Sequence, residues 1–311
     1  MTATALDTDI GISSVSTHAC AKINLTLEIL GLREDGFHEL RSLVVGADLK
    51  DHLACTLRNG PGIELTCADP SLSSGPNLAS EAARRLADDA GIEPALDIRL
   101  EKSIPVGAGL GGGSSDAAAT LRLCNRLWNI GADRRALSKI GAAIGSDVPL
   151  FFSLPSAVMA GRGERVRPVT LRWQGWVVLV HAGPCVSTTS VYRAWSHSHA
   201  AGRPGVDPDD LVNVAAATEL NDRLVNDLEP AVFRVSPAVA EAAERLARSG
   251  HGPFRVSGAG SALYRLYDDQ EAARDAAREI RHQGIGKFTS VLAAPVGESP
   301  LCEGGESNGD H

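Results

Sequence analysis

The sequence predicts an α+β protein built from two domains. Its 311 residues are more than one small core needs, and 43% of them are hydrophobic. Strand-like and helical segments alternate throughout, and the second half reads β-α-β-β-α-β, the split βαβ pattern with a helical insertion. We expect a disordered N-terminus (1–15), an N-terminal domain (16–174), a C-terminal domain (175–296) and a disordered, Gly/Ser/Glu-rich tail (297–311).

The first half begins with strands that we expect to form an antiparallel region. Residues 21–30 alternate apolar and polar side chains, which predicts a half-buried strand carrying Lys22 on its polar face. A turn is expected at 33–36. Further strands are expected at 43–45, 53–57, 63–67, 96–104, 157–161 and 165–171.

Helices are predicted where apolar residues recur with a period of 3.6. The segment 78–90 has this period, with Asn77 as its N-cap and Gly91 as its stop. Two more helices of the first half are expected at 114–128 and 134–144. In the second half we expect strands at 176–180, 254–257, 262–267 and 288–293, and helices at 220–228, 238–248 and 270–282.

Composition excludes several classes of protein. The formal net charge of −8 argues against a nucleic-acid binder, which needs a concentrated basic surface. No apolar stretch reaches 18 residues, and the N-terminus has no secretory signal. The six cysteines are scattered without a CxxC pair, as in a cytoplasmic protein with reduced thiols.

A glycine-rich loop stands between a predicted strand and a predicted helix, with five glycines among residues 107–113. Without Cβ atoms, successive N–H groups can converge on one anion, and the following helix N-terminus adds its own. Ser114 and Ser115 add hydroxyl groups, either of which could ligate Mg²⁺. The loop therefore predicts a phosphate-binding site. Its residues are Pro105, Val106, Gly107, Ala108, Gly109, Leu110, Gly111, Gly112, Gly113, Ser114 and Ser115.

Other interpretations of this loop are weaker. A purely flexible turn would make the framing strand and helix a coincidence. Gly107, Gly109 and Gly112 match the GxGxxG dinucleotide fingerprint, but no second strand ending in an acidic residue follows the helix. A Walker A loop is excluded because no lysine precedes Ser114.

Three other places could carry chemistry. Asp147, in Gly-Ser-Asp-Val-Pro at a helix end, is either a general base or a solvated turn residue. Lys22, taken alone, could be a solvated lysine. The small-residue turn at 256–261 is either a tight hairpin or a close backbone approach to the phosphates.

Together these segments resemble the GHMP kinases, whose members phosphorylate galactose, homoserine, mevalonate and phosphomevalonate. The lysine-bearing strand, the glycine loop and the late glycine turn match the three motifs of that superfamily. The resemblance is closer still to the kinases that act on the cytidine diphosphate derivative of methylerythritol. It covers about residues 18–294 and rests on the stretches 21–40, 145–149, 161–164, 186–188 and 226–230.

The resemblance implies a fold and a set of catalytic roles. It implies a two-domain GHMP-kinase fold, with an N-terminal domain like domain 2 of ribosomal protein S5 and a ferredoxin-like C-terminal domain. Asp147 matches the catalytic aspartate, which takes the proton of the substrate 2-hydroxyl, and Lys22 matches the lysine that supports it. The glycine loop would hold ATP, with Mg²⁺ on ligands that the sequence does not identify. Asn24 is expected beside Lys22, where it helps to position the reacting group.

The resemblance also places the cytidine. Phe37, His38 and Tyr192 match the residues that hold the base, because aromatic rings can sandwich it and histidine can read its polar edge. The family commonly has tyrosine where Phe37 stands. Stacking survives that difference, but a hydrogen bond from the hydroxyl is lost.

The predicted activity is ATP-dependent phosphorylation of the 2-hydroxyl of 4-diphosphocytidyl-2-C-methyl-D-erythritol, in non-mevalonate isoprenoid biosynthesis. A related kinase acting on homoserine or a mevalonate-type acid is one alternative, but those substrates carry no base for residues 36–38 to bind. An inactive relative that serves as a binding protein is another, and the intact Lys22, Asp147 and glycine loop argue against it. The expected partner is this small molecule, with neither nucleic acid nor membrane, and the expected assembly is a monomer or a homodimer.

Overall fold

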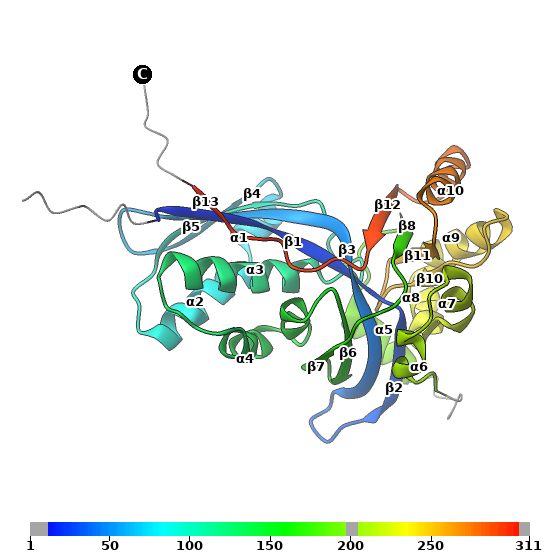
Figure 1. Ribbon diagram of the computed structural model, residues 1–311, viewed down its shortest axis with the longest axis horizontal. Helices are drawn as coiled ribbons and strands as arrows, with labels where there is room; N and C mark the ends of the chain where they lie inside the picture. Colours follow the sequence, from blue (N-terminus) through cyan, green and yellow to red (C-terminus); the bar gives the residue numbers. More distant parts are fainter. Residues whose placement is uncertain (1–11, 197–204, 305–311) are drawn as a thin grey trace, which may run out of the picture.

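The chain folds around two sheets, a larger one formed mainly by the first half of the chain and a smaller one formed by the second half (Figure 1). The structure is a computed structural model that describes residues 12–196 and 205–304. Within these residues the larger sheet has nine strands and the smaller sheet has four. The larger sheet comprises β1 (Ser14–Asn24), β2 (Thr26–Leu32), β3 (His38–Leu57), β4 (Gly62–Cys67), β5 (Ala95–Glu101), β6 (Ser156–Gly161), β7 (Arg165–Pro168), β9 (Val225–Asn226) and β13 (Cys302–Gly304).

The 20-residue strand β3 organises the first half. The sequence predicted two short strands here, at 43–45 and 53–57, but they are parts of this one strand. Its beginning pairs with β2 and β6, its end pairs with β5, and β1 runs antiparallel beside both parts. Each part of β3 therefore has its own partners, so one long strand runs through the whole of the larger sheet (Figure 1).

The predicted strand over 21–30 differs from the structure in two ways. It is split at Leu25 into β1 and β2, and its polar face is not solvated. Lys22, Asn24, Thr26 and Glu28 are each at most 6% exposed. Both faces are buried because the glycine loop and the second half of the chain cover the polar side, where Lys22 N donates to the Leu110 carbonyl oxygen.

The helices of the first half lie along one face of the larger sheet (Figure 1). The predicted helix over 78–90 is confirmed: Asn77 caps it by accepting from Ala79 N, and Gly91 ends it in the left-handed region. The helix predicted from Ser114 starts earlier, at Gly112. These helices are α1 (Pro70–Ser74), α2 (Leu78–Ala90), α3 (Gly112–Leu127), α4 (Arg134–Ile144) and the 3₁₀ helix η1 (Val148–Phe152).

The second half confirms the predicted β-α-β-β-α-β outline. Its sheet has the order β10-β11-β8-β12 with antiparallel pairs throughout. The helix expected over 220–228 stops at Arg223, and β9 follows it. The elements are β8 (Gly175–His181), β10 (Arg255–Val256), β11 (Ala262–Tyr267), β12 (Phe288–Ala294), α5 (Thr188–Ser196), α6 (Pro208–Val212), α7 (Ala217–Arg223), α8 (Glu229–Val235), α9 (Pro237–Arg248) and α10 (Gln270–His282).

Strand β8 joins the two halves because both of its faces are buried. Val178 and Val180 belong to the core that α9 and α10 complete. Val177 and Leu179, which alternate with them, belong to a core shared with Ile23 and its neighbours in β1 and β3. The predicted domain boundary at 174/175 immediately precedes this strand, so the two halves meet along a continuous apolar core.

Parts of both predicted disordered ends are ordered. Strand β1 already begins at Ser14, and the tail beyond Val296 runs beside it to end in β13. The tail is fixed by Thr17 Oγ1, which donates to the Pro300 carbonyl oxygen at 3.0 Å, and by Arg122, which donates to the Ser299 carbonyl oxygen at 2.7 Å. The polar composition of the tail predicted disorder, but the tail is ordered because the edge of β1 supplies backbone hydrogen-bond partners. Residues 1–11 and 305–311 lie outside the described residues.

Two further expectations concern the whole chain. All six cysteines are free, as the scattered spacing predicted. No helix in the described ranges combines the length and the apolar character that crossing a bilayer requires.

Candidate active site

A cavity of about 680 Å³ lies between the two halves. Its walls come from β1, the β2–β3 hairpin, the glycine loop, the start of η1, α5 and the late glycine turn. Every residue that the sequence singled out as a site residue lines this cavity except Ser115, which is buried behind it.

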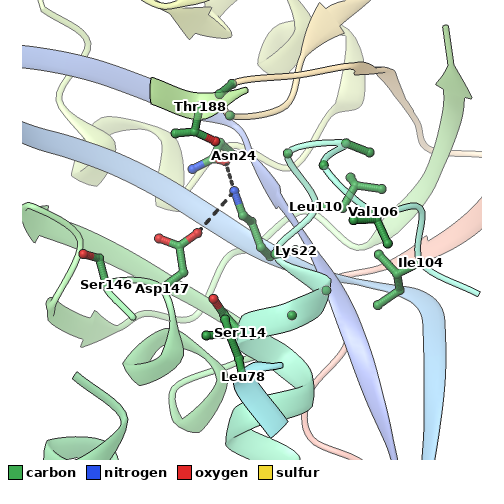
Figure 2. Close-up of a pocket in the computed structure, with 18 of the residues that line it drawn as sticks. Lys22, Asn24, Leu78, Ile104, Val106, Leu110, Ser114, Ser146, Asp147 and Thr188 are labelled. Carbon is green, nitrogen blue, oxygen red and sulfur yellow. Dashed lines mark hydrogen bonds and ion pairs between the residues drawn. The ribbon is translucent and has the colours of Figure 1, made fainter. Parts of the chain in front are cut away.

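Lys22 projects into the middle of the cavity from β1 (Figure 2). Its Nζ donates to Asn24 Oδ1 at 2.5 Å and lies 3.8 Å from Asp147 Oδ2. Positions 22 and 24 share one face of the strand because side chains alternate along it. Burial lowers the pKa of Lys22, and the nearby Asp147 carboxylate only partly opposes that effect.

Asp147 approaches Lys22 from the opposite wall (Figure 2). It stands immediately before η1, whose five residues are all buried, so the apolar packing of that helix fixes the carboxylate at the cavity. Its side chain is 37% exposed, which leaves room for a reacting group. Asp147 is therefore a cavity residue that faces a buried ammonium, and not a freely solvated turn residue.

Asn24 is held by a chain of hydrogen bonds. Its Nδ2 donates to Ser42 Oγ at 2.8 Å, and the Ser42 hydroxyl donates in turn to the Thr26 carbonyl oxygen. The backbone carbonyl oxygen of Asn24 accepts from Tyr264 OH at 2.8 Å, which fixes the main chain at this position. These contacts fix the orientation of the amide, so Oδ1 faces the Lys22 ammonium.

At Gly107, Gly109 and Gly111 the glycine loop packs so closely that a Cβ would not fit. Gly111 has φ +71°, and a Cβ there would lie 2.9 Å from Lys22 Cγ and 3.0 Å from Phe151 Cζ. The residue ends the loop and caps α3, whose first turn presents free N–H groups to the cavity. The loop is thus a rigid, backbone-lined cradle at a helix N-terminus.

The late glycine turn closes the cavity from the second half. Ser257 Oγ donates to the Gly109 carbonyl oxygen at 3.3 Å, and Ala262 N donates to the Ala108 carbonyl oxygen at 3.0 Å. The sequence left open whether this turn is a simple hairpin or a close backbone approach. It packs directly on the glycine loop, and Gly258 lines the cavity.

A second lysine at the cavity, the largely buried Lys102, was not expected from the sequence. Lys102 Nζ donates to Asp116 Oδ2 at 2.7 Å and to Asp51 Oδ2, while Asp51 Oδ1 accepts from Ser103 N at 2.6 Å and from Ile104 N at 2.8 Å. Burial by itself would lower the pKa of Lys102, but the two carboxylates outweigh it and raise the pKa. The sequence feature that could have pointed to Lys102 is Asp116, a charged residue one turn inside an Ala/Leu-rich helix, because such a carboxylate needs a partner of opposite charge.

Asp116 lines the cavity but does not have all its hydrogen bonds. Its Oδ1 is buried and has no hydrogen-bond partner among the described residues. Burial raises the pKa of Asp116 to about 7, and the Lys102 ammonium opposes that shift. The carboxyl group is therefore poised to interact with a ligand or a cation placed beside the loop.

The three expected base-binding residues form one end of the cavity. The His38 and Tyr192 rings pack with centroids 5.0 Å apart, and Trp195 meets His38 edge-on at 5.2 Å. The Arg162 guanidinium carbon lies over the Phe37 ring, 5.1 Å from the ring centroid, and Phe37 is 49% exposed. The sequence reasoning did not assign Arg162 or Trp195. Burial, with a smaller effect of Asp147, raises the pKa of Tyr192 to about 12.

The opposite end of the cavity is apolar and was also missed. It lies where the glycine loop meets the α1–α2 connection, as the right and lower parts of Figure 2 show. No motif marks it, because it consists of ordinary apolar residues brought together by the fold. Its lining includes Leu72, Pro76, Leu78, Leu100, Ile104 and Val106.

Family comparisons agree with this geometry. The family described as "GHMP kinases N terminal domain" matches residues 77–153, and "GHMP kinases C terminal" matches residues 209–286. A 4-diphosphocytidyl-2-C-methyl-D-erythritol kinase of Parvibaculum lavamentivorans is 38% identical over 90% of this chain and 98% of its own length. One from Geobacter sp. strain M21 is 40% identical over 84% of this chain and 92% of its own length.

Solved structures give the same result. A crystal structure of 4-(cytidine 5'-diphospho)-2C-methyl-D-erythritol kinase is 32% identical, with a TM-score of 0.70 over 90% of this chain and 99% of that one. Homoserine kinase from Cytophaga hutchinsonii has a TM-score of 0.66 at 15% identity, over 97% of this chain and all of its own. At that identity the second likeness concerns the fold alone.

Proposed function

The chain belongs to the GHMP kinases and, within them, to the family of 4-diphosphocytidyl-2-C-methyl-D-erythritol kinases, and from this premise we propose its reaction. It transfers the γ-phosphoryl group of ATP to the 2-hydroxyl of 4-diphosphocytidyl-2-C-methyl-D-erythritol, giving the 2-phosphate and ADP. Lys22, Asp147 and the first turn of α3 meet in one cavity, and this convergence carries the proposal.

ATP lies along the glycine loop in this proposal. Its triphosphate accepts hydrogen bonds from loop N–H groups and from the N-terminus of α3, so phosphate binding needs few formal charges. This explains how a chain with a net charge of −8 can bind two phosphate-bearing molecules. The apolar end near Leu78 and Val106 takes the adenine, because a flat, weakly polar ring fits an apolar slot.

Asp147 and Lys22 act on the substrate hydroxyl. The 2-hydroxyl oxygen attacks the γ-phosphorus, the bond to the β,γ-bridging oxygen breaks, and Asp147 accepts the hydroxyl proton. Lys22 lies between Asp147 and Asn24, where its ammonium favours the Asp147 carboxylate and orients the hydroxyl. Asn24 holds the lysine in place through its fixed amide.

Mg²⁺ accompanies ATP in this proposal. The unpartnered Asp116 Oδ1 and the Ser114 hydroxyl offer the oxygen ligands that Mg²⁺ prefers, and both residues line the cavity beside the loop. No group of three or more His, Cys, Asp or Glu side chains in the described ranges could hold a metal, so most ligands would come from phosphate and water. The ion would neutralise charge on the transferred phosphoryl group.

The cytidine binds at the end formed by Phe37, His38 and Tyr192. Their rings, together with Arg162 over Phe37, offer stacking surfaces, and the His38 imidazole offers polar atoms to a base edge. A substrate reaching from this end to Lys22 explains why both groups line one cavity. The free cysteines support a reducing compartment, and we place the reaction in the cytoplasm.

The test is ATP consumption by the purified protein with different acceptors. We expect ADP release with 4-diphosphocytidyl-2-C-methyl-D-erythritol and none above background with homoserine or mevalonate, and phosphorus NMR should show a new monophosphate at the 2-position. Equal turnover with homoserine or mevalonate would refute the proposed specificity. Tight binding of the cytidylylated compound without turnover would instead favour an inactive binding protein.

A further inference from the structure

Asn226 uses its whole side-chain amide to hold the late glycine turn. Its Nδ2 donates to the carbonyl oxygens of Val256 and Gly258, both at 2.8 Å. Its Oδ1 accepts from Leu228 N at 2.9 Å, just before α8 begins. One side chain thus ties two carbonyl groups of the turn to the chain that enters α8.

The turn that Asn226 holds is a part of the second half that lies close to Lys22 and Asn24. Gly258 has φ +56°, and a Cβ there would lie 3.2 Å from both Lys22 Nζ and Asn24 Oδ1. Asn24 N donates to Ser257 Oγ at 3.3 Å. A small displacement of this turn would therefore change the space around Lys22 and Asn24.

Asn226 is also anchored to the first half. It lies in β9, which pairs in parallel with β2, where Leu27 is opposite Asn226. The next residue continues the link: Asp227 N donates to the Leu27 carbonyl oxygen at 2.9 Å, and Asp227 Oδ2 accepts from Ile29 N at 2.8 Å. The turn is therefore fixed relative to β2, which directly follows the strand β1 that carries Lys22 and Asn24.

We propose that Asn226 is a positioning residue for phosphoryl transfer, holding the Gly258 turn against Lys22 and Asn24. The inference rests on the proposed function. Asn226 does not line the cavity and acts only through the turn. The two carbonyl oxygens of the turn need two N–H donors on one atom, and Leu228 N needs an acceptor. The asparagine amide supplies all three, whereas an aspartate carboxylate supplies no donor.

The test compares Asn226→Asp with Asn221→Asp in the full-length chain. Asn221, in α7, makes a similar bridge to Leu266, near the end of β11 that is farther from the turn, donating to its carbonyl oxygen at 2.9 Å and accepting from its N–H at 3.2 Å. Asn226→Asp should lower kcat on the order of 10- to 100-fold, with the KM of ATP changed less than about threefold. Asn221→Asp should lower the melting temperature by at least as much as Asn226→Asp but keep kcat.

A second readout separates positioning from general loosening of the fold. The Gly258 turn helps to bury Lys22, so Asn226→Asp should move the alkaline limb of the kcat–pH profile, whereas Asn221→Asp should not. If Asn226→Asp is unfolded at the assay temperature, Asn226→Ala, which removes the donors without adding charge, is measured instead. Unchanged kcat and pH profile in either Asn226 variant, with an active wild type, overturn this inference alone. An inactive wild type overturns the proposed function and this inference with it.

Discussion

Two lysines that line the same cavity have opposite pKa shifts. Lys22 Nζ lies 3.8 Å from the partly exposed carboxylate of Asp147, and burial lowers the pKa of Lys22. Lys102 donates to two buried carboxylates, Asp51 and Asp116, which raise its pKa. Burial by itself would lower the pKa of both lysines, but Lys102 is somewhat more exposed (13% against 6%) and has two close carboxylate partners where Lys22 has one.

This contrast supports the proposed reactive role of Lys22 and a structural role for Lys102. Lys102 is saturated by charge partners and ties the end of β5 to α3 and β3 through Asp116 and Asp51. Lys22 has a loose ion pair and a single hydrogen bond, so its charge remains available to a substrate. A buried charge with few partners is typical of a catalytic position, whereas a fully paired one is typical of structural support.

The largest expected effect is the loss of activity in Lys22→Met. We expect kcat to fall on the order of 10³-fold, because the ammonium that supports Asp147 is gone. The free energy of unfolding should change by no more than about 1 kcal/mol, since relief of the buried charge offsets the lost hydrogen bond to Asn24. Steady-state kinetics and urea denaturation of the same preparation check both parts. A variant that keeps near-normal turnover contradicts the assigned role of Lys22.

Lys102→Met should lower the free energy of unfolding much more than Lys22→Met does. Removing this partner leaves Asp51 and Asp116 buried without a counter-charge, which costs about 3–5 kcal/mol of unfolding free energy. Urea denaturation without ligands measures the loss. The double variant Lys102→Met/Asp116→Asn is the control, since removing one of the two carboxylates should restore part of the stability. No loss in the single variant would mean that the cluster is not a structural support.

The smallest expected effect is a decrease in kcat at alkaline pH. The pKa of Lys22 lies below the ordinary lysine value of 10.5, so the ammonium is lost, and kcat falls, as pH rises toward that value. Neither Lys102, whose pKa is raised, nor Tyr192, with a pKa of about 12, accounts for such a decrease. The kcat–pH profile up to pH 10.5, with circular dichroism to verify folding, tests this. A flat profile in folded protein would show that Lys22 titrates no earlier than an exposed lysine.

Local signals in the sequence predicted most of the regular elements. The α2 helix has a side-chain cap, a glycine stop and a clear period, and its predicted limits are those of the structure. The same holds for α4 and α10, whose predicted spans are also confirmed. Strand β3 and β13 were not predicted as such, because pairing with distant strands determines them and leaves no local pattern.

The site divides in the same way. Lys22, Asp147 and the glycine loop lie in recognisable motifs, so the sequence identified them as candidates. Lys102 and the apolar end of the cavity carry no motif, and only the packing of β5, α1 and α2 around the loop brings them to the site.

Local patterns of residue types are enough to specify the groups available for chemistry: a backbone cradle for phosphate, a candidate base and a candidate ammonium. Which of these groups come into contact depends on how distant segments pack. Lys22 and Asp147 are separated by 125 positions along the chain, and their 3.8 Å contact exists because β1 and η1 pack around α3. Burial, which lowers the pKa of one lysine while carboxylate partners raise that of another, is likewise a property of the folded neighbourhood, because a local sequence window does not contain the groups that exclude water.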